Sequence, residues 1–279
     1  MLIDTHAHLY WEDFKKDFDH VIQHSLDGGV TIIINVGVDV ELSKAAVELN
    51  SDKIKFYSTI GLHPHEAVKH SLDPNVSIHQ DIIQLEQVYQ SNIPKCIAVG
   101  ECGLDYYFDP QFTPSSITAE QIKSLQKQLF QAQIELARKL NLPLIVHCRD
   151  DRSKNPQNSE AWDEVLKMIG DHPTILHCYS GLEQTTQKVL KMLNAIVSFT
   201  ATITYPKNEY LRDAAKLLPL EKIVLETDCP FLPPQSKRGI RNEPSTVLEI
   251  AQLIAEIKGL SFEEVANQTT KNAEKIFNI

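Results

Sequence analysis

The chain has 279 residues, of which 42% are hydrophobic and 23% are charged, as in soluble globular proteins with a substantial core. Lysine and arginine number 27 against 37 aspartates and glutamates, and the net charge of −10 argues against a protein that coats nucleic acid non-specifically. No apolar run is long enough to cross a membrane and no basic and apolar leader opens the chain, so we expect a cytoplasmic protein.

Eight short runs rich in β-branched residues recur along the chain and predict β-strands. They cover residues 2–5, 31–36, 55–60, 96–100, 144–147, 174–177, 195–199 and 223–226. The segments between them show helical periodicity, at 14–26, 76–88, 121–140, 162–169, 189–193 and 211–218. Pro244 and Gly259 suit the first turn and the end of a further helix, and Ser261 and Glu264 form a capping box before a last pair of short helices.

Strand and helix alternate eight times, which predicts an α/β fold with a parallel sheet closed into a single-domain TIM (β/α)8 barrel over residues 1–279. An open, doubly wound sheet is the alternative. No glycine-rich phosphate-binding turn follows an early strand, and this favours the barrel.

Residues that can bind a metal ion stand at the carboxyl ends of the predicted strands. They are His6, His8, His63, His65, Glu101, His147, His177 and Asp228. In a parallel barrel these strand ends share one rim, so residues that are scattered in sequence converge. Taken singly, each of these residues could equally be an ordinary polar side chain at the end of a strand. Together they predict a metal centre, because imidazole and carboxylate are common metal ligands.

The five cysteines show no zinc-finger spacing, and their odd number argues against a disulfide framework. Four of them directly follow a proposed ligand: Cys102, Cys148, Cys178 and Cys229. Neighbours in a strand point to opposite faces, so we expect these thiols to lie buried between the barrel and its helices. A thiolate zinc site would need them on the same face as the histidines.

Seven motifs occur in the order DTHAHL, GLHPHE, GECGLDYY, HCRD, HCYSG, ETDCPFL and RGIRNEP. In this order they resemble the TatD family of metal-dependent hydrolases. The resemblance implies a metallo-dependent hydrolase barrel that cleaves DNA phosphodiester bonds with one or two divalent ions (Mg, Mn or Zn). It implies that His6, His8, Glu101 and Asp228 hold one ion, and that Glu101 bridges to a second ion held with His147 and His177. It places His63 beside the site in contact with substrate or leaving group. We expect His65 to contact substrate as well.

Two metals can clamp the attacking and leaving oxygens of an in-line displacement, and they lower the pKa of a bound water. Asp228 can take that water's proton as a general base or serve only as a metal ligand. We expect Asp228, Glu101 and His63 to be the catalytic residues. Arg149 and Arg241 can bind phosphate through their guanidinium groups. Tyr106 and its neighbour Tyr107 can stack on a base, with core packing as the equal alternative for at least one of them.

Three classes of function compete. The first is a monomeric deoxyribonuclease, either a 3′-to-5′ exonuclease on single-stranded DNA, which we expect, or a small endonuclease. The second keeps the metal site but acts on an ester, as a D-aminoacyl-tRNA deacylase, or on a small molecule, as an amidohydrolase; Glu101 stands where many amidohydrolases carry a lysine. The third is a metal-holding scaffold without turnover. A missing metal ligand would favour it, but none of the expected ligands is missing. The long segments 108–121 and 150–162 follow strands four and five. We expect both on the rim, where they would affect the length or strandedness of the substrate that the site accepts.

Overall fold

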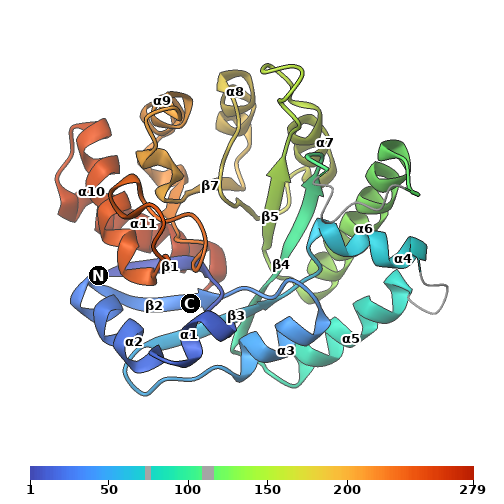
Figure 1. Ribbon diagram of the computed structural model, residues 1–279, viewed down its shortest axis with the longest axis horizontal. Coiled ribbons are helices and arrows are strands. Elements are labelled where there is room, and N and C mark those ends of the chain that lie inside the picture. The colour runs from blue at the N-terminus through green and yellow to red at the C-terminus, as the bar shows by residue number, and fades with distance from the viewer. Residues whose placement is uncertain (73–76, 109–115) are drawn as a thin grey trace.

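The computed structural model describes residues 1–72, 77–108 and 116–279. Eight parallel strands follow one another around a barrel in chain order (Figure 1). They are β1 (Leu2–Ala7), β2 (Val30–Asn35), β3 (Lys55–Ile60), β4 (Cys96–Asp105), β5 (Leu144–Arg149), β6 (Thr174–Leu176), β7 (Ala195–Phe199) and β8 (Ile223–Leu225). The predicted barrel fold is therefore confirmed, and each predicted strand lies within a few residues of an observed one.

The barrel is closed by the residues that follow β8 and not by a ladder between β8 and β1. Ala7 forms an isolated parallel bridge with Cys229. The backbone N–H of Asp228 donates to the carbonyl of His6 at 2.8 Å, and the N–H of His8 donates to the carbonyl of Cys229 at 2.9 Å. Closure thus takes place among the residues predicted to bind metal, and it sets β1 against the segment after β8.

The helices lie on the outside of the strands (Figure 1). They are α1 (Glu12–Lys15), α2 (Phe18–Asp27), α3 (Val40–Glu48), α4 (Lys69–Leu72), α5 (Ile78–Gln90), α6 (Ala119–Leu140), α7 (Glu160–Ile169), α8 (Glu183–Lys191), α9 (Glu209–Leu217), α10 (Val247–Lys258) and α11 (Phe262–Phe277). Among the described residues no helix is both long enough and apolar enough to span a membrane.

The capping box at the start of α11 is present, with Ser261 and Glu264 each bonding the other's backbone. The expectation of two short helices after it is wrong. α11 runs without a break for 16 residues. No glycine or proline interrupts this stretch, so nothing in its sequence breaks the helix.

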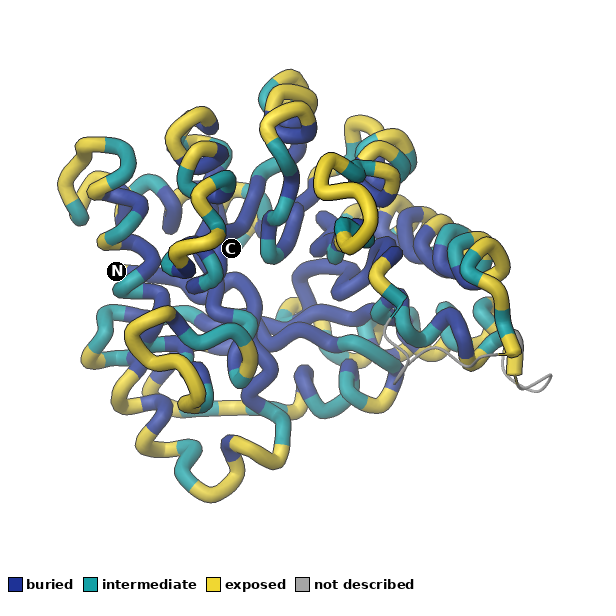
Figure 2. Tube along the Cα trace, turned by 45° about the horizontal axis from the view of Figure 1, so that its top comes forward, coloured by how far each residue is buried: buried dark blue, intermediate teal, exposed yellow. Residues whose placement is uncertain are grey.

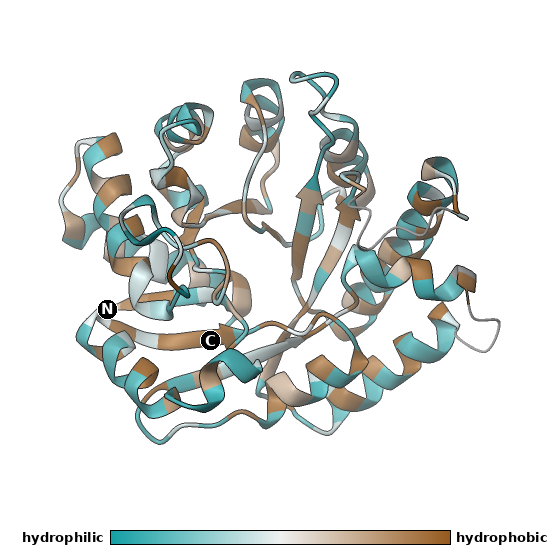
Figure 3. Ribbon diagram, viewed as in Figure 1, coloured by the Kyte–Doolittle hydropathy of each residue, from teal (hydrophilic) through white to brown (hydrophobic). Residues whose placement is uncertain are grey.

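The core has two layers, because alternate residues of each strand point to opposite faces. One cluster fills the barrel and includes Ile3, Ile34 and Ile145. A larger cluster lies between strands and helices and includes Leu144 and Val146. The strands are accordingly buried and the outer faces of the helices exposed (Figure 2). Hydrophobic residues run along the strands, whereas the helices alternate hydrophobic and hydrophilic segments (Figure 3).

The cysteines follow this division with one exception. Cys102, Cys148 and Cys229 are buried in the barrel–helix layer, as expected. Cys178 is only half-buried, and its φ of +42° shows that strand geometry does not continue to it. β6 ends at Leu176, two residues earlier, so the alternation used in that prediction does not apply to this thiol.

Strand β4 is five residues longer than predicted and runs to Asp105, with every residue buried. Glu101 therefore lies inside a strand and not in the loop behind it. Gly103 permits this extension, because a Cβ atom there would stand 2.0 Å from the carbonyl oxygen of His147. The glycine lets β4 approach β5 closely beside a predicted metal ligand.

Candidate metal centre

The first group of predicted ligands comes from β1 and from the segment that closes the barrel. Nε2 of His6 lies 3.2 Å from Nε2 of His8. Oδ1 of Asp228 lies 3.3 Å from the His8 nitrogen and 3.7 Å from the His6 nitrogen. Oε2 of Glu101 lies 3.3 Å from Nε2 of His6. Four potential ligand atoms from three parts of the chain thus converge.

The second group surrounds the other oxygen of Glu101. Oε1 lies 2.9 Å from Nδ1 of His147, 3.5 Å from Nε2 of His177 and 3.6 Å from Nε2 of His63. The two oxygens of one carboxylate therefore face two different groups of imidazoles. The geometry brings all six predicted ligands together with Glu101 at their centre, as a bridging carboxylate requires.

The hydrogen-bond partners of the first group suit a cation. The carbonyl oxygen of Val36 lies 2.9 Å from Nδ1 of His8, and because a carbonyl can only accept, this nitrogen carries the hydrogen. Nε2 of His8 then presents a lone pair. Nδ1 of His6 faces a carboxylate, Oε2 of Glu226, at 4.0 Å, which favours a hydrogen on that nitrogen as well. Two nitrogen lone pairs and two carboxylates then share one point without a donor among them, and a divalent ion fits there.

Protonation states point the same way. Burial and the neighbouring His177 lower the pKa of His6, and burial lowers the pKa of His63 to about 3, so both imidazoles are neutral near pH 7. Burial alone would raise the pKa of Glu101, but the surrounding histidines, His177 first, hold it well below its usual range. Neutral imidazole and ionised carboxylate are the forms that bind metal.

His147 and His177 differ, since each lies between two carboxylates. Although burial acts against it, contacts with Asp105 and Glu101 raise the pKa of His147 to about 9. Glu226 and Glu101 raise the pKa of His177 to about 10 in the same way. In the metal-free protein these two rings carry protons that a bound ion would displace, so metal uptake releases protons.

Among the described residues, three groups of side chains have ligand atoms within 4.8 Å of one another: His6 with His8 and Asp228, His6 with Glu101 and His177, and His63 with Glu101 and His147. By distance alone His63 is therefore a further potential ligand. Nδ1 of His63, however, accepts the N–H of His65 at 3.2 Å. The hydrogen of a neutral His63 must then sit on Nε2, the atom that faces Glu101, and a donor in that place suits a substrate oxygen better than a metal ion.

Two carboxylates behind the predicted ligands escaped the sequence analysis. Oε1 of Glu226 lies 2.8 Å from Nδ1 of His177, and Oδ2 of Asp105 lies 3.0 Å from Nε2 of His147. Both are almost completely buried. Such carboxylates orient metal-binding imidazoles. A signal was available, because Glu226 stands two residues before Asp228 and Asp105 four after Glu101.

Helix α6 fixes the backbone beside the site through two buried glutamines seven residues apart. The side chain of Gln126 accepts the N–H of Asp105 at 2.9 Å and donates to its carbonyl at 3.0 Å. Gln133 does the same for Leu62, at 2.7 and 2.9 Å. Gln126 thereby satisfies both backbone groups of Asp105, and Gln133 satisfies both backbone groups of the residue before His63.

Comparison with known proteins agrees with this centre. Residues 3–278 match the family model of the TatD-related DNases. The chain belongs to this family. It is 35% identical over 281 residues to an uncharacterized metal-dependent hydrolase of Bacillus subtilis, YabD, with all of both chains covered. It is 30% identical over 284 residues to the 3′-5′ ssDNA/RNA exonuclease TatD of Citrobacter rodentium, covering 100% of this chain and 98% of the relative. These matches make the chain a TatD-family metal-dependent hydrolase.

Among solved structures, the TatD homologue YjjV of Escherichia coli K12 superposes with a TM-score of 0.83 at 28% identity, covering 100% of this chain and 98% of YjjV. A hydrolase of the TatD family from Entamoeba histolytica gives a TM-score of 0.78 at 24% identity, covering 99% of this chain and 97% of that one, and this likeness concerns the fold alone.

Two of the predicted substrate contacts in this TatD-family chain need correction. Tyr106 is only 2% exposed and its hydroxyl donates to Glu164, so its ring has no free face for a base. Both terminal nitrogens of Arg241 are occupied. They donate to Asp17 at 2.9 and 2.7 Å, to Glu243 at 2.9 Å and to a backbone carbonyl, so no pair of donors is left for a phosphate. The sequence indicates that these residues lie near the rim. It does not show that the Tyr106 hydroxyl and the Arg241 guanidinium already bond other residues of the chain.

His65 and Arg149, like His63, stay predictions as substrate contacts, and both lie beside the predicted metal centre. His65 is half-buried, and its Nε2 lies 3.4 Å from Oδ2 of Asp105, beside His63. Arg149 is exposed, and its guanidinium carbon lies 4.0 Å from the centre of the Tyr107 ring. Tyr107, and not Tyr106, is the exposed tyrosine of the pair. Half of segment 108–121, predicted to bear on substrate length, lies at residues 109–115, outside the described ranges.

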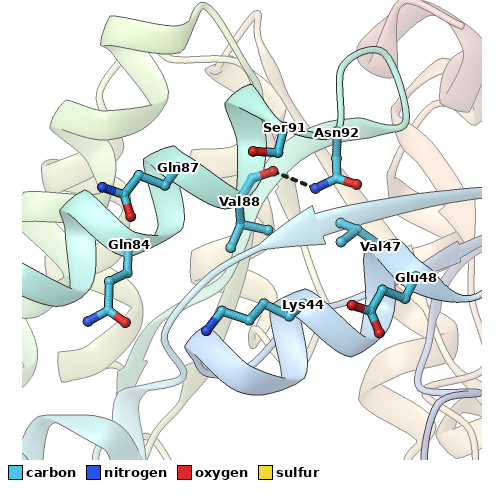
Figure 4. A pocket seen from close by; sticks show the side chains of 8 residues that line it. All are labelled: Lys44, Val47, Glu48, Gln84, Gln87, Val88, Ser91 and Asn92. Carbon is cyan, nitrogen blue, oxygen red and sulfur yellow. Dashed lines mark hydrogen bonds between the residues drawn. The ribbon is translucent and has the colours of Figure 1, made fainter.

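A hollow between α3 and α5 is separate from the predicted metal centre (Figure 4). Its walls carry Lys44, Val47, Glu48, Gln84, Gln87, Val88, Ser91 and Asn92. None of the predicted ligands lines it, and its long polar side chains converge on no common point. The cluster of histidines and carboxylates, and not the shape of the surface, therefore makes the rim of the barrel the candidate functional site.

Proposed function

We propose that the protein is a divalent-metal-dependent nuclease that hydrolyses phosphodiester bonds of single-stranded DNA from the 3′ end. The observation that carries this proposal is the position of Glu101, whose two oxygens face two separate groups of imidazoles. Paired ion sites of this kind suit the in-line displacement at a phosphodiester. The name of the Citrobacter rodentium relative supports the nucleic-acid substrate and the direction of attack.

His6, His8, Glu101 and Asp228 would hold one ion, and Glu101, His147 and His177 a second. Bound there, magnesium, manganese or zinc would supply positive charge for the anionic phosphate and would acidify a water molecule. Magnesium prefers oxygen ligands, whereas the mixed imidazole and carboxylate set suits zinc or manganese as well.

Asp228 is the most exposed side chain of the first group, at 15%, and is therefore the carboxylate most accessible to a water molecule. Burial opposes it, but contact with His8 and the charge of the protonated His177 lower the pKa of Asp228, so the carboxylate is ionised near pH 7. An ionised carboxylate in this place can accept a proton from the attacking water.

His63 would act on the other side of the reaction. Its side chain is 17% exposed, and the tautomer fixed by the N–H of His65 places a hydrogen on Nε2. Nε2 can donate a hydrogen bond to a phosphate oxygen or to the leaving oxygen. Glu101 would link the two halves of the site, because one of its oxygens faces His6 and the other faces His147, His177 and His63.

The test is digestion of end-labelled single-stranded DNA by metal-depleted protein to which magnesium or manganese is restored. Wild-type protein is expected to give a ladder of shortened products, and Glu101→Gln, which keeps the side-chain shape, to give none. Glu86→Gln is the matched control, since Glu86 lies on α5 in contact with Lys139 and away from the rim. DNA left intact by wild-type protein with every ion tried would overturn the proposal, and the same proteins would then be assayed on D-aminoacyl-tRNA.

A further inference from the structure

Two exposed aromatic rings flank the predicted metal centre. Phe231 is 43% exposed and Tyr107 39% exposed, whereas most aromatic side chains of the described residues are covered. Scattered exposed apolar residues need no explanation. These two differ from the others because each is linked by one or two contacts to a predicted metal ligand.

Phe231 follows the segment that closes the barrel. Its N–H donates to the carbonyl of Asp228 at 3.0 Å. The Phe231 ring packs edge-on against Trp11 with centroids 5.4 Å apart, and its centroid lies 6.2 Å from that of His8. An aromatic surface therefore lies against the first group of ligands, on the side of β1 and β8.

Tyr107 is the second residue after β4. Its N–H donates to Oδ1 of Asp105 at 2.9 Å, and the other oxygen of Asp105 lies 3.0 Å from His147. Arg149, which pairs with Asp105 across β4 and β5, lies over the Tyr107 ring. A second aromatic surface, with a cation on it, therefore lies two residues beyond Asp105, the carboxylate that contacts His147 of the second group.

The two surfaces belong to opposite sides of the barrel. In a ring of eight strands taken in order, the junction of β8 with β1 lies half a turn from the pair β4 and β5. The metal centre, with Glu101 reaching both groups, lies between them. A chain laid across the rim from one ring to the other would pass over this centre.

The chemistry of the two surfaces suits unstacked nucleobases. A base on an aromatic ring contributes about 1–3 kcal/mol whatever its sequence, and a guanidinium stacked beside it adds attraction for the base and the phosphate. Bases of a duplex have their faces covered by their neighbours, so only a single strand can use both rings. The positive charge of Arg149 also helps to attract an anionic strand, because the chain as a whole has a net charge of −10.

We propose that Phe231 and the Tyr107–Arg149 pair are base-stacking surfaces that hold a single strand across the rim with the scissile phosphate between them. This inference rests on the proposed nuclease function and names the features of the strand that the site recognises. Selectivity then comes from bases on both sides of the phosphate, without recognition of a particular sequence.

The test compares a single-stranded oligonucleotide with one of the same length that carries abasic residues around the scissile bond. Phe231→Ala and Tyr107→Ala are each expected to lower kcat/KM on the base-bearing strand about 5- to 150-fold, the equivalent of about 1–3 kcal/mol, and to leave the abasic strand unchanged. Phe231→Tyr and Tyr107→Phe keep a ring and should retain wild-type values. Leu193→Ala, at a 94% exposed residue of the α8–β7 connection, is the surface control.

A second readout does not depend on turnover. Binding of the two fluorescein-labelled strands to metal-free protein, followed by anisotropy, should show tighter binding of the base-bearing strand, and each alanine variant should reduce that preference. Equal losses on both strands, or no loss on either, would overturn the stacking role. If wild-type protein cleaves neither strand, the nuclease proposal fails; the binding preference still decides whether the two rings recognise bases.

Discussion

Oε1 of Glu226 lies 2.8 Å from Nδ1 of His177, and both side chains are almost entirely out of contact with solvent. The other oxygen of Glu226 lies 4.0 Å from Nδ1 of His6. The rings of His6 and His177 are stacked, with centroids 3.7 Å apart. One buried carboxylate thus faces two imidazoles that belong to different groups of predicted ligands and directs their Nε2 atoms toward Glu101.

Replacing Glu226 by glutamine should weaken metal binding about 10- to 100-fold, because the shape is kept while the charge that supports both imidazoles is lost. Isothermal titration of metal-depleted protein with zinc or manganese measures this directly, and the absorption spectrum of bound cobalt reports changed ligand geometry. Glu86→Gln makes the same chemical change on the surface of α5 and should bind like wild type. Equal affinities for all three proteins would show that Glu226 does not support the ligands.

Bound metal should stabilise the fold, since the ion binds the folded rim and not the unfolded chain. At a free metal concentration about 100 times the dissociation constant, the gain in unfolding free energy is about 2.7 kcal/mol. Thermal unfolding with and without added ion measures it. Glu101→Gln should lose most of this gain, because Glu101 contacts both groups of ligands. A melting temperature that does not respond to any divalent ion would contradict the predicted centre.

Helix α6 should contribute to stability and to activity through Gln133, which bonds both backbone groups of Leu62, the residue before His63. Gln133→Leu leaves a buried N–H and a buried carbonyl without partners, so the unfolding free energy should fall by about 1–3 kcal/mol per unpaired group at most. Urea denaturation of metal-free protein measures the loss. Gln131→Leu, on the exposed face of the same helix, is the control, and an equal effect of the two substitutions would contradict this role.

The barrel and the positions of the predicted ligands followed from local sequence alone. Strand runs, helical periodicity and the shared rim of parallel strands are set by residues close together in the chain. The supporting interactions were harder to foresee. Glu226 contacts His177 from 49 residues away, and Arg241 is occupied by Asp17, 224 residues distant, so neither pairing leaves a local pattern. The length of β4 depends on its approach to β5 at Gly103, which is again a tertiary contact.

The buried carboxyl group of Asp4 should make the unfolding free energy depend on pH. Asp4 lies in β1 and is fully buried. Burial raises its pKa to about 8 and outweighs the hydrogen bonds from the Thr227 hydroxyl, the Thr227 N–H and the His6 N–H. The unfolded chain has the ordinary value of 3.8. Between about pH 4 and pH 8 the folded protein therefore binds a proton that the unfolded chain has lost, and unfolding free energy falls as pH rises, by up to about 1.4 kcal/mol per pH unit.

Asp4→Asn removes this titration while keeping an oxygen that can accept the two N–H groups and an amide that can donate to the Thr227 hydroxyl. Stability of the variant relative to wild type should therefore increase steadily from about pH 4 to pH 8 and stay constant above that range. Urea denaturation of both metal-free proteins at several pH values gives the difference. All other ionisable groups are the same in both proteins, so their contribution to the difference in unfolding free energy cancels unless the substitution shifts them. A difference that does not change with pH would show that Asp4 is ionised in the fold, and that its three hydrogen bonds outweigh the cost of burying its charge.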